Sequence, residues 1–225
     1  MFERLSLLIG EDNLNKIKGK TILIVGVGGV GGYTATSLVR SGIENIIIID
    51  YDTIDITNIN RQITAYHSTI GKKKVDVLSN MLLDINPNIK ITKYDMFLSE
   101  QNIESIFDNC NIDYIIDACD ALKTKKAIIK YCLDKNIKFI SSMGTGNKLD
   151  PTKLEVTDIR KTNNDPVARI IRKWVKDNKI NKKIPVLCSK EVPKKVGNVV
   201  SSNSFVPSSA GLIITSYIIN DIIKE

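Results

Sequence analysis

The chain has 225 residues, of which 43% are apolar and 25% are charged. This composition is that of a globular domain and excludes a disordered, collagenous or fibrous protein. No run of residues approaches the ~20 apolar residues that span a bilayer, so stable membrane insertion is not expected. The four cysteines are widely spaced and form no Cys-x-x-Cys pair, which argues against a disulfide framework and a four-cysteine zinc site. These features favour a location in the reducing cytoplasm.

Positive charge is concentrated in one part of the chain. The formal net charge is +7, and the segment 160–195 contains twelve Lys or Arg residues and three acids. That segment therefore carries a charge of +9, and the remainder of the chain carries −2. A basic segment on a nearly neutral body favours a polyanionic partner such as nucleic acid, because phosphate neutralisation supplies affinity that is independent of sequence. The alternative is a lysine-rich surface that serves only solubility.

Apolar strands alternate with helical segments from the start of the chain to about residue 145. Residues 21–25 form a buried strand, followed by a glycine cluster and a helix that runs to about residue 41. Further strands are predicted at 45–50, 90–94, 113–117 and 137–142, with helices at about 71–85, 100–109 and 123–135. This alternation predicts an α/β fold with a Rossmann-like, mostly parallel sheet that is covered by helices on both faces.

The pattern becomes irregular after about Gly146. A basic helix is predicted near 165–178, followed by a loop rich in Ser, Pro and Gly and by an apolar helix at 209–223. Trp174 lies on the basic helix, and we interpret it as an anchor to the core, with a base-stacking platform as the alternative. Residues 1–225 are interpreted as a single domain, in which a core at 1–145 carries an irregular basic C-terminal extension at 146–225.

The glycine cluster carries the first chemical signal. Gly26-Val27-Gly28-Gly29-Val30-Gly31 lies between the first strand and its helix, where backbone N–H groups and the helix amino terminus can bind phosphate. Asp50 ends the second strand 19 residues after Gly31, the position of an acid that accepts hydrogen bonds from ribose hydroxyls. The pattern predicts an adenine nucleotide and leaves NAD and ATP open. The alternative is that the glycines only pack a helix against a strand.

The segments that follow favour ATP. Arg61, in Thr57-Asn58-Ile59-Asn60-Arg61-Gln62, and Lys74, which ends Gly71-Lys72-Lys73-Lys74, suit the charge of a triphosphate at the sheet edge. The fourth strand ends in Asp117-Ala118-Cys119-Asp120, where a carboxylate can hold Mg²⁺ against phosphates. Each of these charges taken singly fits a solvated surface group, and their joint spacing favours a nucleotide site.

These motifs carry a resemblance to a known superfamily. Residues 1–145, with the Gly-x-Gly-Gly-x-Gly cluster, Asp50-Tyr51-Asp52, the segment 57–62, Gly71–Lys74 and Asp117–Asp120, resemble the ThiF-type, ubiquitin-activating-like adenylating enzymes. That superfamily includes the molybdopterin and thiamine sulfur-carrier adenylyltransferases. The resemblance implies that Arg61, Lys74 and Asp120 act in catalysis and that Asp120 binds Mg²⁺. It also implies an ATP site that includes Gly26, Gly28, Gly29, Gly31, Asp50, Asp52, Asn58, Arg61, Lys74, Asp120 and Arg4.

The second half of the chain narrows the resemblance. Its markers are Ser142–Gly146 with Leu149-Asp150-Pro151, Asp158–Thr162 with Asp165–Ala168 and Arg172, Val186–Glu191, Ser204–Pro207, and Ala210-Gly211. With Arg4 and Leu8-Ile9-Gly10, they resemble the tRNA threonylcarbamoyladenosine dehydratases over essentially the whole chain. One alternative is an adenylyltransferase for a ubiquitin-like sulfur-carrier protein, although those enzymes usually carry two Cys-x-x-Cys pairs. A non-catalytic or NAD-dependent nucleotide-binding module is the other.

The dehydratase resemblance implies a reaction and its partners. The substrate is tRNA that carries N6-threonylcarbamoyladenosine beside the anticodon. ATP activates the threonyl carboxylate, the ureido group closes a five-membered ring, and water is lost. The basic extension then faces the tRNA. The resemblance further implies a symmetric homodimer in which Arg4 reaches the partner's nucleotide. It leaves open the need for a monovalent cation and the docking of a sulfur-transfer protein.

Three other residues were considered for chemistry. Cys188 is a candidate catalytic residue because relatives in the superfamily use a cysteine as a covalent acceptor, with sulfur handling or packing as the alternatives. Cys119 lies in the end of a predicted strand and is interpreted as packing. His67, the only histidine, follows a polar loop and is not expected to act in catalysis.

Overall fold

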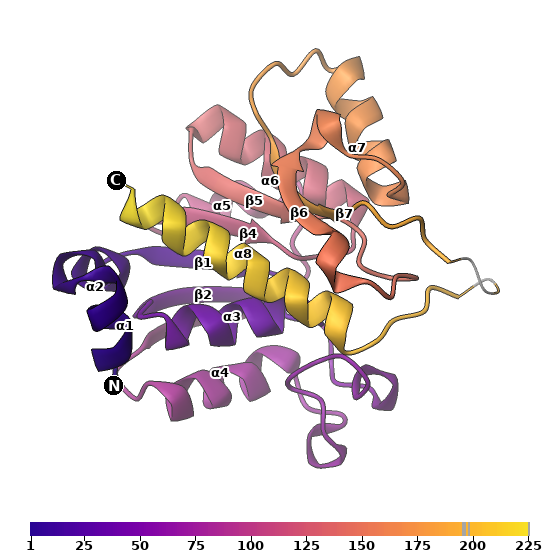
Figure 1. Ribbon diagram of the computed structural model, residues 1–225. Helices are drawn as coiled ribbons and strands as arrows, with labels where there is room; N and C mark the ends of the chain where they lie inside the picture. The colour runs from indigo at the N-terminus through magenta and orange to yellow at the C-terminus, as the bar shows by residue number, and fades with distance from the viewer. Residues whose placement is uncertain (195–196, 198, 225) are drawn as a thin grey trace.

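A seven-stranded sheet forms the centre of the molecule. The computed structural model describes residues 1–194, 197 and 199–224, so that Lys195 at the end of the basic segment lies outside the described residues (Figure 1). The strands lie in the order β3-β2-β1-β4-β5-β7-β6, and all neighbours are parallel except β6 and β7. Their bounds are Thr21–Val25 (β1), Asn45–Asp50 (β2), Lys90–Asp95 (β3), Tyr114–Asp117 (β4), Lys138–Ser142 (β5), Leu154–Asp158 (β6) and Pro185–Ser189 (β7).

Helices cover both faces of the sheet. In β1, Ile22 and Ile24 pack in one hydrophobic cluster with α2, α3, α4 and α8, whereas Leu23 and Val25 pack in a second cluster with α5, α6 and α7. This alternation of side chains places one cluster on each face. The predicted Rossmann-like architecture is confirmed. The helices are α1 (Glu3–Ile9), α2 (Glu11–Lys18), α3 (Gly31–Arg40), α4 (Lys74–Ile85), α5 (Ile103–Phe107), α6 (Leu122–Lys135), α7 (Pro166–Asp177) and α8 (Phe205–Ile223).

The extension is more regular than the sequence predicts, because two strands accompany the two predicted helices. Residues 146–224 contribute α7, α8 and two strands, and β7 pairs with β5 on one side and β6 on the other (Figure 1). The β7 signal is weak in the sequence because Pro185 and Ser189 enclose only three apolar residues. Its neighbour β5 ends more than forty residues earlier, so the pairing depends on contacts that no short window of sequence contains. The extension therefore completes the sheet of the core.

The apolar C-terminal helix α8 belongs to the hydrophobic core. By length and composition it passes as a membrane-crossing helix, but half of its most apolar window is buried inside the protein. Gly211 allows a close crossing with α3, because a Cβ atom there would lie 2.6 Å from the carbonyl oxygen of Val30. The hydroxyl of Thr34 donates to the Gly211 carbonyl oxygen at 3.3 Å across the same contact. Burial of this kind is that of a core helix in a globular protein.

Candidate nucleotide site

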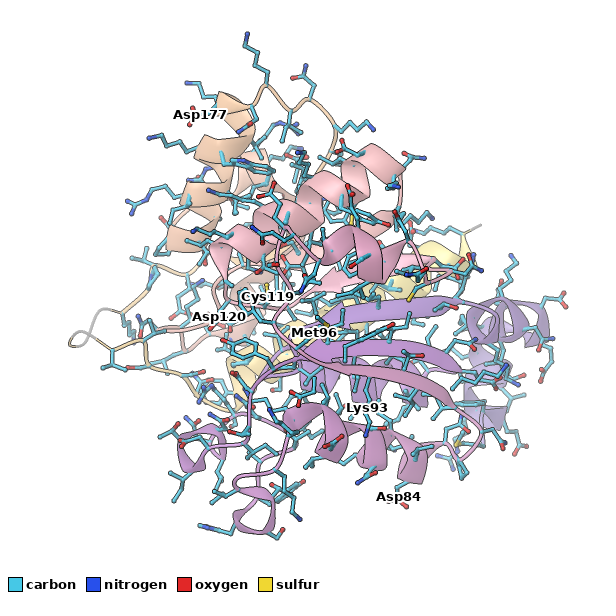
Figure 2. All side chains as sticks on the ribbon, turned by 180° about the vertical axis from the view of Figure 1, so that it is seen from behind. Asp84, Lys93, Met96, Cys119, Asp120 and Asp177 are labelled. Atoms are coloured by element: carbon cyan, nitrogen blue, oxygen red, sulfur yellow. The ribbon has the colours of Figure 1, made fainter. Side chains whose placement is uncertain are left out.

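A cavity of about 310 Å³ opens at the carboxyl ends of β1, β2 and β4. Ligands bind at this edge of open α/β sheets because the loops that follow parallel strands converge there. Figure 2 shows Met96, Cys119 and Asp120 gathered at this edge. The cavity brings together nine of the residues expected in the ATP site, namely Gly26, Gly28, Gly29, Asp50, Asp52, Asn58, Arg61, Lys74 and Asp120.

The glycines of the cluster have different roles. Gly26 has φ +84°, and a Cβ atom there would lie 2.8 Å from the Ala118 carbonyl oxygen, so this glycine allows the tight turn after β1. At Gly31 a Cβ atom would lie 1.9 Å from the Gly26 carbonyl oxygen, and Gly31 itself does not line the cavity. A Cβ atom at Gly28 would meet nothing closer than 3.6 Å. The surface of Gly28 is thus left open toward the cavity, where a phosphate can approach the backbone.

Asp50 ties the glycine loop to the end of β2. Its carboxylate accepts hydrogen bonds from the backbone N–H groups of Val27 at 2.8 Å and Asp52 at 2.9 Å. One carboxylate oxygen accepts each bond, and every carboxylate oxygen has a second lone pair. Asp50 can therefore hold the loop in shape and still accept a hydrogen bond from a ribose hydroxyl.

Burial distinguishes Lys74 from the two lysines before it. Lys74 is 5% exposed, and its Nζ atom lies 2.6 Å from Oδ2 of Asp52. Lys72 is exposed, and Lys73 pairs with Asp95 at 3.1 Å on the surface. Lys74 is the first residue of α4, so the end of that helix directs its side chain into the cavity. Among the lysines of the Gly71–Lys74 motif, Lys74 is the one in position to contact a phosphate.

Arg61 is held by the loop that precedes it. Its Nη1 atom donates to the Thr57 carbonyl oxygen at 2.8 Å and to Oδ1 of Asn60 at 3.0 Å. Asn58 is buried, and its Oδ1 atom accepts the Asp55 N–H group at 3.2 Å in a capping box. Asn58 thus stabilises the turn that positions Arg61. The remaining guanidinium donors of Arg61 stay available to a phosphate.

Two aspartates at the end of β4 differ in their surroundings. Asp120 is exposed and lines the cavity, whereas Asp117 is fully buried beside Lys125. In the described part of the chain, no three His, Cys, Asp or Glu side chains gather as a metal cluster. Mg²⁺ at nucleotide sites is held by one or two carboxylates together with substrate phosphates. The carboxylate of Asp120 beside the glycine loop fits that arrangement.

Comparison with known proteins agrees with this geometry. The sequence profile of the ThiF family matches residues 2–213. A tRNA threonylcarbamoyladenosine dehydratase from Bacillus subtilis is 40% identical in an alignment of 242 positions. The alignment covers 100% of this chain and 95% of that protein. The chain belongs to the ThiF family, among these dehydratases.

Two crystal structures of the E. coli tRNA N6-threonylcarbamoyladenosine dehydratase are similar to the structure of this chain. The complex with ATP has a TM-score of 0.93 and 31% identity over 99% of this chain and 93% of that one. The complex with AMP has a TM-score of 0.92 and 30% sequence identity, and the match covers 97% of this chain and 92% of that one.

Three residues considered from the sequence lie away from the cavity of this ThiF-family chain. Arg4 lies exposed on α1, which Figure 1 places beside α2, at the end of the sheet opposite the loops that form the cavity. His67 is exposed in a short 3-10 helix and does not line the cavity. Cys188 lies on β7, is 2% exposed and is absent from the cavity lining. The structure does not bring Arg4 or Cys188 to the nucleotide site of the same chain.

The environment of Cys188 does not support the predicted catalytic role. Burial raises the pKa of its thiol to about 11, and the nearby carboxylate of Glu155 adds to the rise. A nucleophilic cysteine needs an accessible thiolate, which a lowered pKa provides. Burial likewise raises the pKa of Cys119, whose Sγ atom lies 3.1 Å from Oδ1 of Asp117. Both thiols therefore stay protonated near neutral pH, as expected of packing residues.

Replacement of Cys188 by alanine is expected to leave turnover unchanged. The thiol packs in the second core cluster, so we expect a loss of about 1 kcal/mol in the free energy of unfolding. Steady-state assays with tRNA and ATP, together with urea unfolding followed by circular dichroism, measure the two effects. A large drop in kcat in a variant that remains folded would restore Cys188 to the catalytic residues.

The cavity also contains residues to which the sequence patterns assign no role. Gln62 is buried, and its Oε1 atom has no hydrogen-bond partner within the described residues. Phe97 and Leu98 follow β3 at the carboxyl edge of the sheet. The place of Gln62 next to Arg61 in its motif, and of Phe97 and Leu98 after the third strand, could have predicted that they lie near the site. Thr145 and Pro207 also line the cavity. Both lie in the marker segments Ser142–Gly146 and Ser204–Pro207, but no local pattern shows that these segments fold back onto the glycine loop.

Proposed function

We propose that this chain catalyses the ATP-dependent dehydration of N6-threonylcarbamoyladenosine in tRNA, beside the anticodon. The observation that carries the proposal is a single cavity in which Arg61, Lys74 and Asp120 face an open glycine loop. The similarity to tRNA threonylcarbamoyladenosine dehydratases over nearly the full length of both chains supports it.

The reaction needs an activated carboxylate. The threonyl carboxylate of the substrate is a poor electrophile because its leaving group would be oxide. Transfer of a phosphoryl group from ATP, with release of ADP, or of an adenylyl group, with release of pyrophosphate, converts one carboxylate oxygen into a weakly basic leaving group. The ureido group then attacks the same carbonyl carbon and loses a proton to solvent. The carbon–oxygen bond to the phosphate breaks, phosphate or AMP leaves with that oxygen, and the five-membered ring closes. Ring closure is intramolecular, so the enzyme mainly holds the geometry and stabilises charge on the phosphates.

Each side chain has a defined place in this proposal. The backbone N–H groups at Gly28 and Gly29 and the amino terminus of α3 bind phosphate, and Asp50 binds the ribose. Lys74 and Arg61 stabilise the charge that develops on the phosphates, while Asp52 orients Lys74 through its 2.6 Å contact. Asp120 would hold Mg²⁺, whose positive charge would offset the negative charge of the phosphates. We place the enzyme in the cytoplasm, where ATP and tRNA are both available.

We further propose that the enzyme is a homodimer with shared sites. The α1 helix has no buried residues, and Leu7 and Leu8 on it are 82% and 81% exposed. Neighbouring exposed apolar side chains of this size are typical of an interface. Arg4 lies on the same helix, away from the cavity of its own chain, so a nucleotide that it contacts belongs to the partner.

Mass spectrometry of nucleosides tests the proposed reaction. The purified protein is incubated with Mg-ATP and with tRNA that carries threonylcarbamoyladenosine, and the tRNA is digested under mild conditions because the ring reopens easily. The expected result is the loss of one water from that nucleoside, dependent on ATP. Unchanged nucleoside in the presence of nucleotide binding would contradict the proposal. ATP–pyrophosphate exchange only with a diglycine-tailed protein would then favour the sulfur-carrier adenylyltransferase, the alternative from the sequence.

Mixing two inactive variants tests the shared site. An Arg4→Ala subunit supplies an intact cavity, and a Lys74→Ala subunit supplies an intact Arg4, so each mixed dimer has one complete site. After random exchange of equal amounts, about a quarter of the wild-type activity is expected, because half of the dimers are mixed and each has one of two sites. Each variant alone serves as the control. Failure of the mixture to exceed the separate variants, despite demonstrated subunit exchange, would rule out a site shared through Arg4.

A further inference from the structure

We infer that the outer face of α7 binds the phosphate backbone of the tRNA, an inference that rests on the proposed function. The inner face of this helix is anchored in the protein through Ala168, Ile171 and Val175, which are buried. Arg169, Lys173 and Lys176 lie on the opposite side and are exposed. Their spacing of four and three residues places these three cations in one stripe along the helix.

No acidic side chain lines the groove beside α7 among the residues that the structure describes. Six of its nine lining residues are basic, namely Arg160, Arg169, Arg172, Lys173, Lys176 and Lys179. Across residues 1–194, 197 and 199–224, no carboxylate forms an ion pair with Arg169, Lys173 or Lys176. These charges are therefore available to an external anion.

Two arginines of the groove have structural partners. Nη1 of Arg172 donates to the Thr162 carbonyl oxygen at 2.7 Å. Nη2 of Arg160 donates to the carbonyl oxygens of Ile180 and Lys182 at 2.9 and 2.8 Å. The Arg172 contact connects α7 to the end of the short 3-10 helix Ile159–Lys161, which follows β6. The Arg160 contacts connect that same short helix to the chain after α7. The wall of the groove is thus held in place, while the cations of the stripe stay unpaired.

A buried ion pair connects α7 to the nucleotide cavity. Asp165 caps the helix by accepting the Ala168 N–H group at 2.8 Å, and its other oxygen lies 2.7 Å from Nζ of Lys148. Lys148 also donates to the Gly144 carbonyl oxygen, next to Thr145 in the cavity wall. The side chains of Lys148 and Asp165 are 1% and 0% exposed. The amino terminus of α7 is therefore fixed beside the cavity.

The free end of the helix points away from that site. Figure 2 shows Asp177, the last residue of α7, at the outer end of the helix, away from Cys119 and Asp120. A strand bound along α7 would therefore lead from the molecular surface toward the cavity. In an anticodon arm the modified base is unpaired, so it can enter the pocket while the phosphates stay on the surface.

The composition of the stripe favours a nucleic acid over an acidic protein. Protein interfaces are built around a desolvated apolar centre. On the outer face of α7 the exposed large apolar side chain among the described residues is Ile170, at 39%. Cations without such a centre match a phosphate backbone, for which affinity comes largely from the release of counterions.

Matched triple variants test the inference. The variant Arg169→Gln, Lys173→Gln, Lys176→Gln lowers the net charge from +7 to +4, and so does the control Lys16→Gln, Lys90→Gln, Lys224→Gln, whose residues are exposed elsewhere. Binding of an unmodified tRNA transcript is measured without ATP between about 50 and 200 mM salt. We expect the α7 variant to bind about 10- to 100-fold more weakly at low salt, with the slope of log K against log salt reduced by about 2 to 3. The control should bind like the wild type.

The outcomes separate this inference from the proposed function. Equal slopes for the α7 variant, the control and the wild type would overturn the inference, even if the wild type cyclises the nucleoside. Loss of binding in the α7 variant alone would support it, even if the wild type fails to cyclise the nucleoside and the proposed function falls. Polyglutamate serves as a probe for an acidic protein partner. If the α7 variant loses binding to polyglutamate but binds tRNA like the wild type, the stripe binds an acidic protein and the inference is overturned. Circular dichroism confirms that each variant is folded.

Discussion

Replacement of Lys74 by alanine is expected to lower the kcat of tRNA dehydration by about 10²- to 10³-fold. That range is typical for the loss of one preorganised donor that stabilises developing charge. The Lys74 ammonium group is nearly buried at the cavity and is oriented by the carboxylate of Asp52 at 2.6 Å. Low solvent exposure strengthens the interaction of this ammonium group with a phosphate. In the alanine variant, water that fills the space of the lysine side chain carries no charge and does not restore that interaction. Single-turnover assays with saturating ATP and tRNA measure the effect on the chemical step.

The same motif supplies a matched control for Lys74. Lys72 lies two residues earlier, and its side chain is exposed. Lys72→Ala removes the same charge from the same segment, and we expect it to keep wild-type turnover. An equal loss of activity in both variants would show that the total charge of the segment, and not the position of Lys74, governs the reaction.

Replacement of Lys125 by methionine is expected to destabilise the protein by about 3 to 5 kcal/mol. This is the usual loss when one partner of a buried ion pair is removed and the other charge is left behind. The side chains of Lys125 and Asp117 are 2% and 0% exposed, and Nζ lies 3.1 Å from both carboxylate oxygens. Lys125 also donates to the Ser142 carbonyl oxygen at 2.7 Å, which connects α6 to β4 and β5. The loss is a large part of the ~5 to 15 kcal/mol that stabilises a typical domain.

Urea unfolding of two further variants tests the origin of this loss. Lys123→Met changes an exposed lysine on the same helix and should shift the free energy of unfolding by no more than about 0.5 kcal/mol. The double variant Asp117→Asn, Lys125→Met leaves no charge at this buried site and should regain part of the stability that Lys125→Met loses. A Lys125→Met protein as stable as the wild type would show that the buried carboxylate does not need its partner.

Much of the core was predictable from local patterns. The apolar runs at 21–25 and 45–50 match β1 and β2 residue for residue, and the glycine cluster lies at the predicted turn. These predictions hold because strand periodicity and the backbone freedom of Gly26 depend on interactions among residues only a few positions apart. The convergence of Arg61, Lys74 and Asp120 was also predictable, since each follows or precedes a parallel strand that ends at one edge.

The remaining features depend on distant parts of the chain. A local pattern cannot show that β7 lies between β5 and β6, because β7 begins 43 residues after the end of β5 and 27 residues after the end of β6. Nor does it show that Cys188 faces a core cluster instead of the cavity.

The sequence by itself determined the turn of the glycine cluster, the parallel arrangement of the core strands and the chemical types of the side chains that gather at the cavity, because these features follow from local patterns along the chain. Tertiary structure decided how deeply Lys74 is buried beside Asp52 and which thiols are buried. It also joined the basic helix α7 to the cavity wall through Lys148 and Asp165. Those outcomes depend on solvent exclusion, which arises only when separated segments pack together.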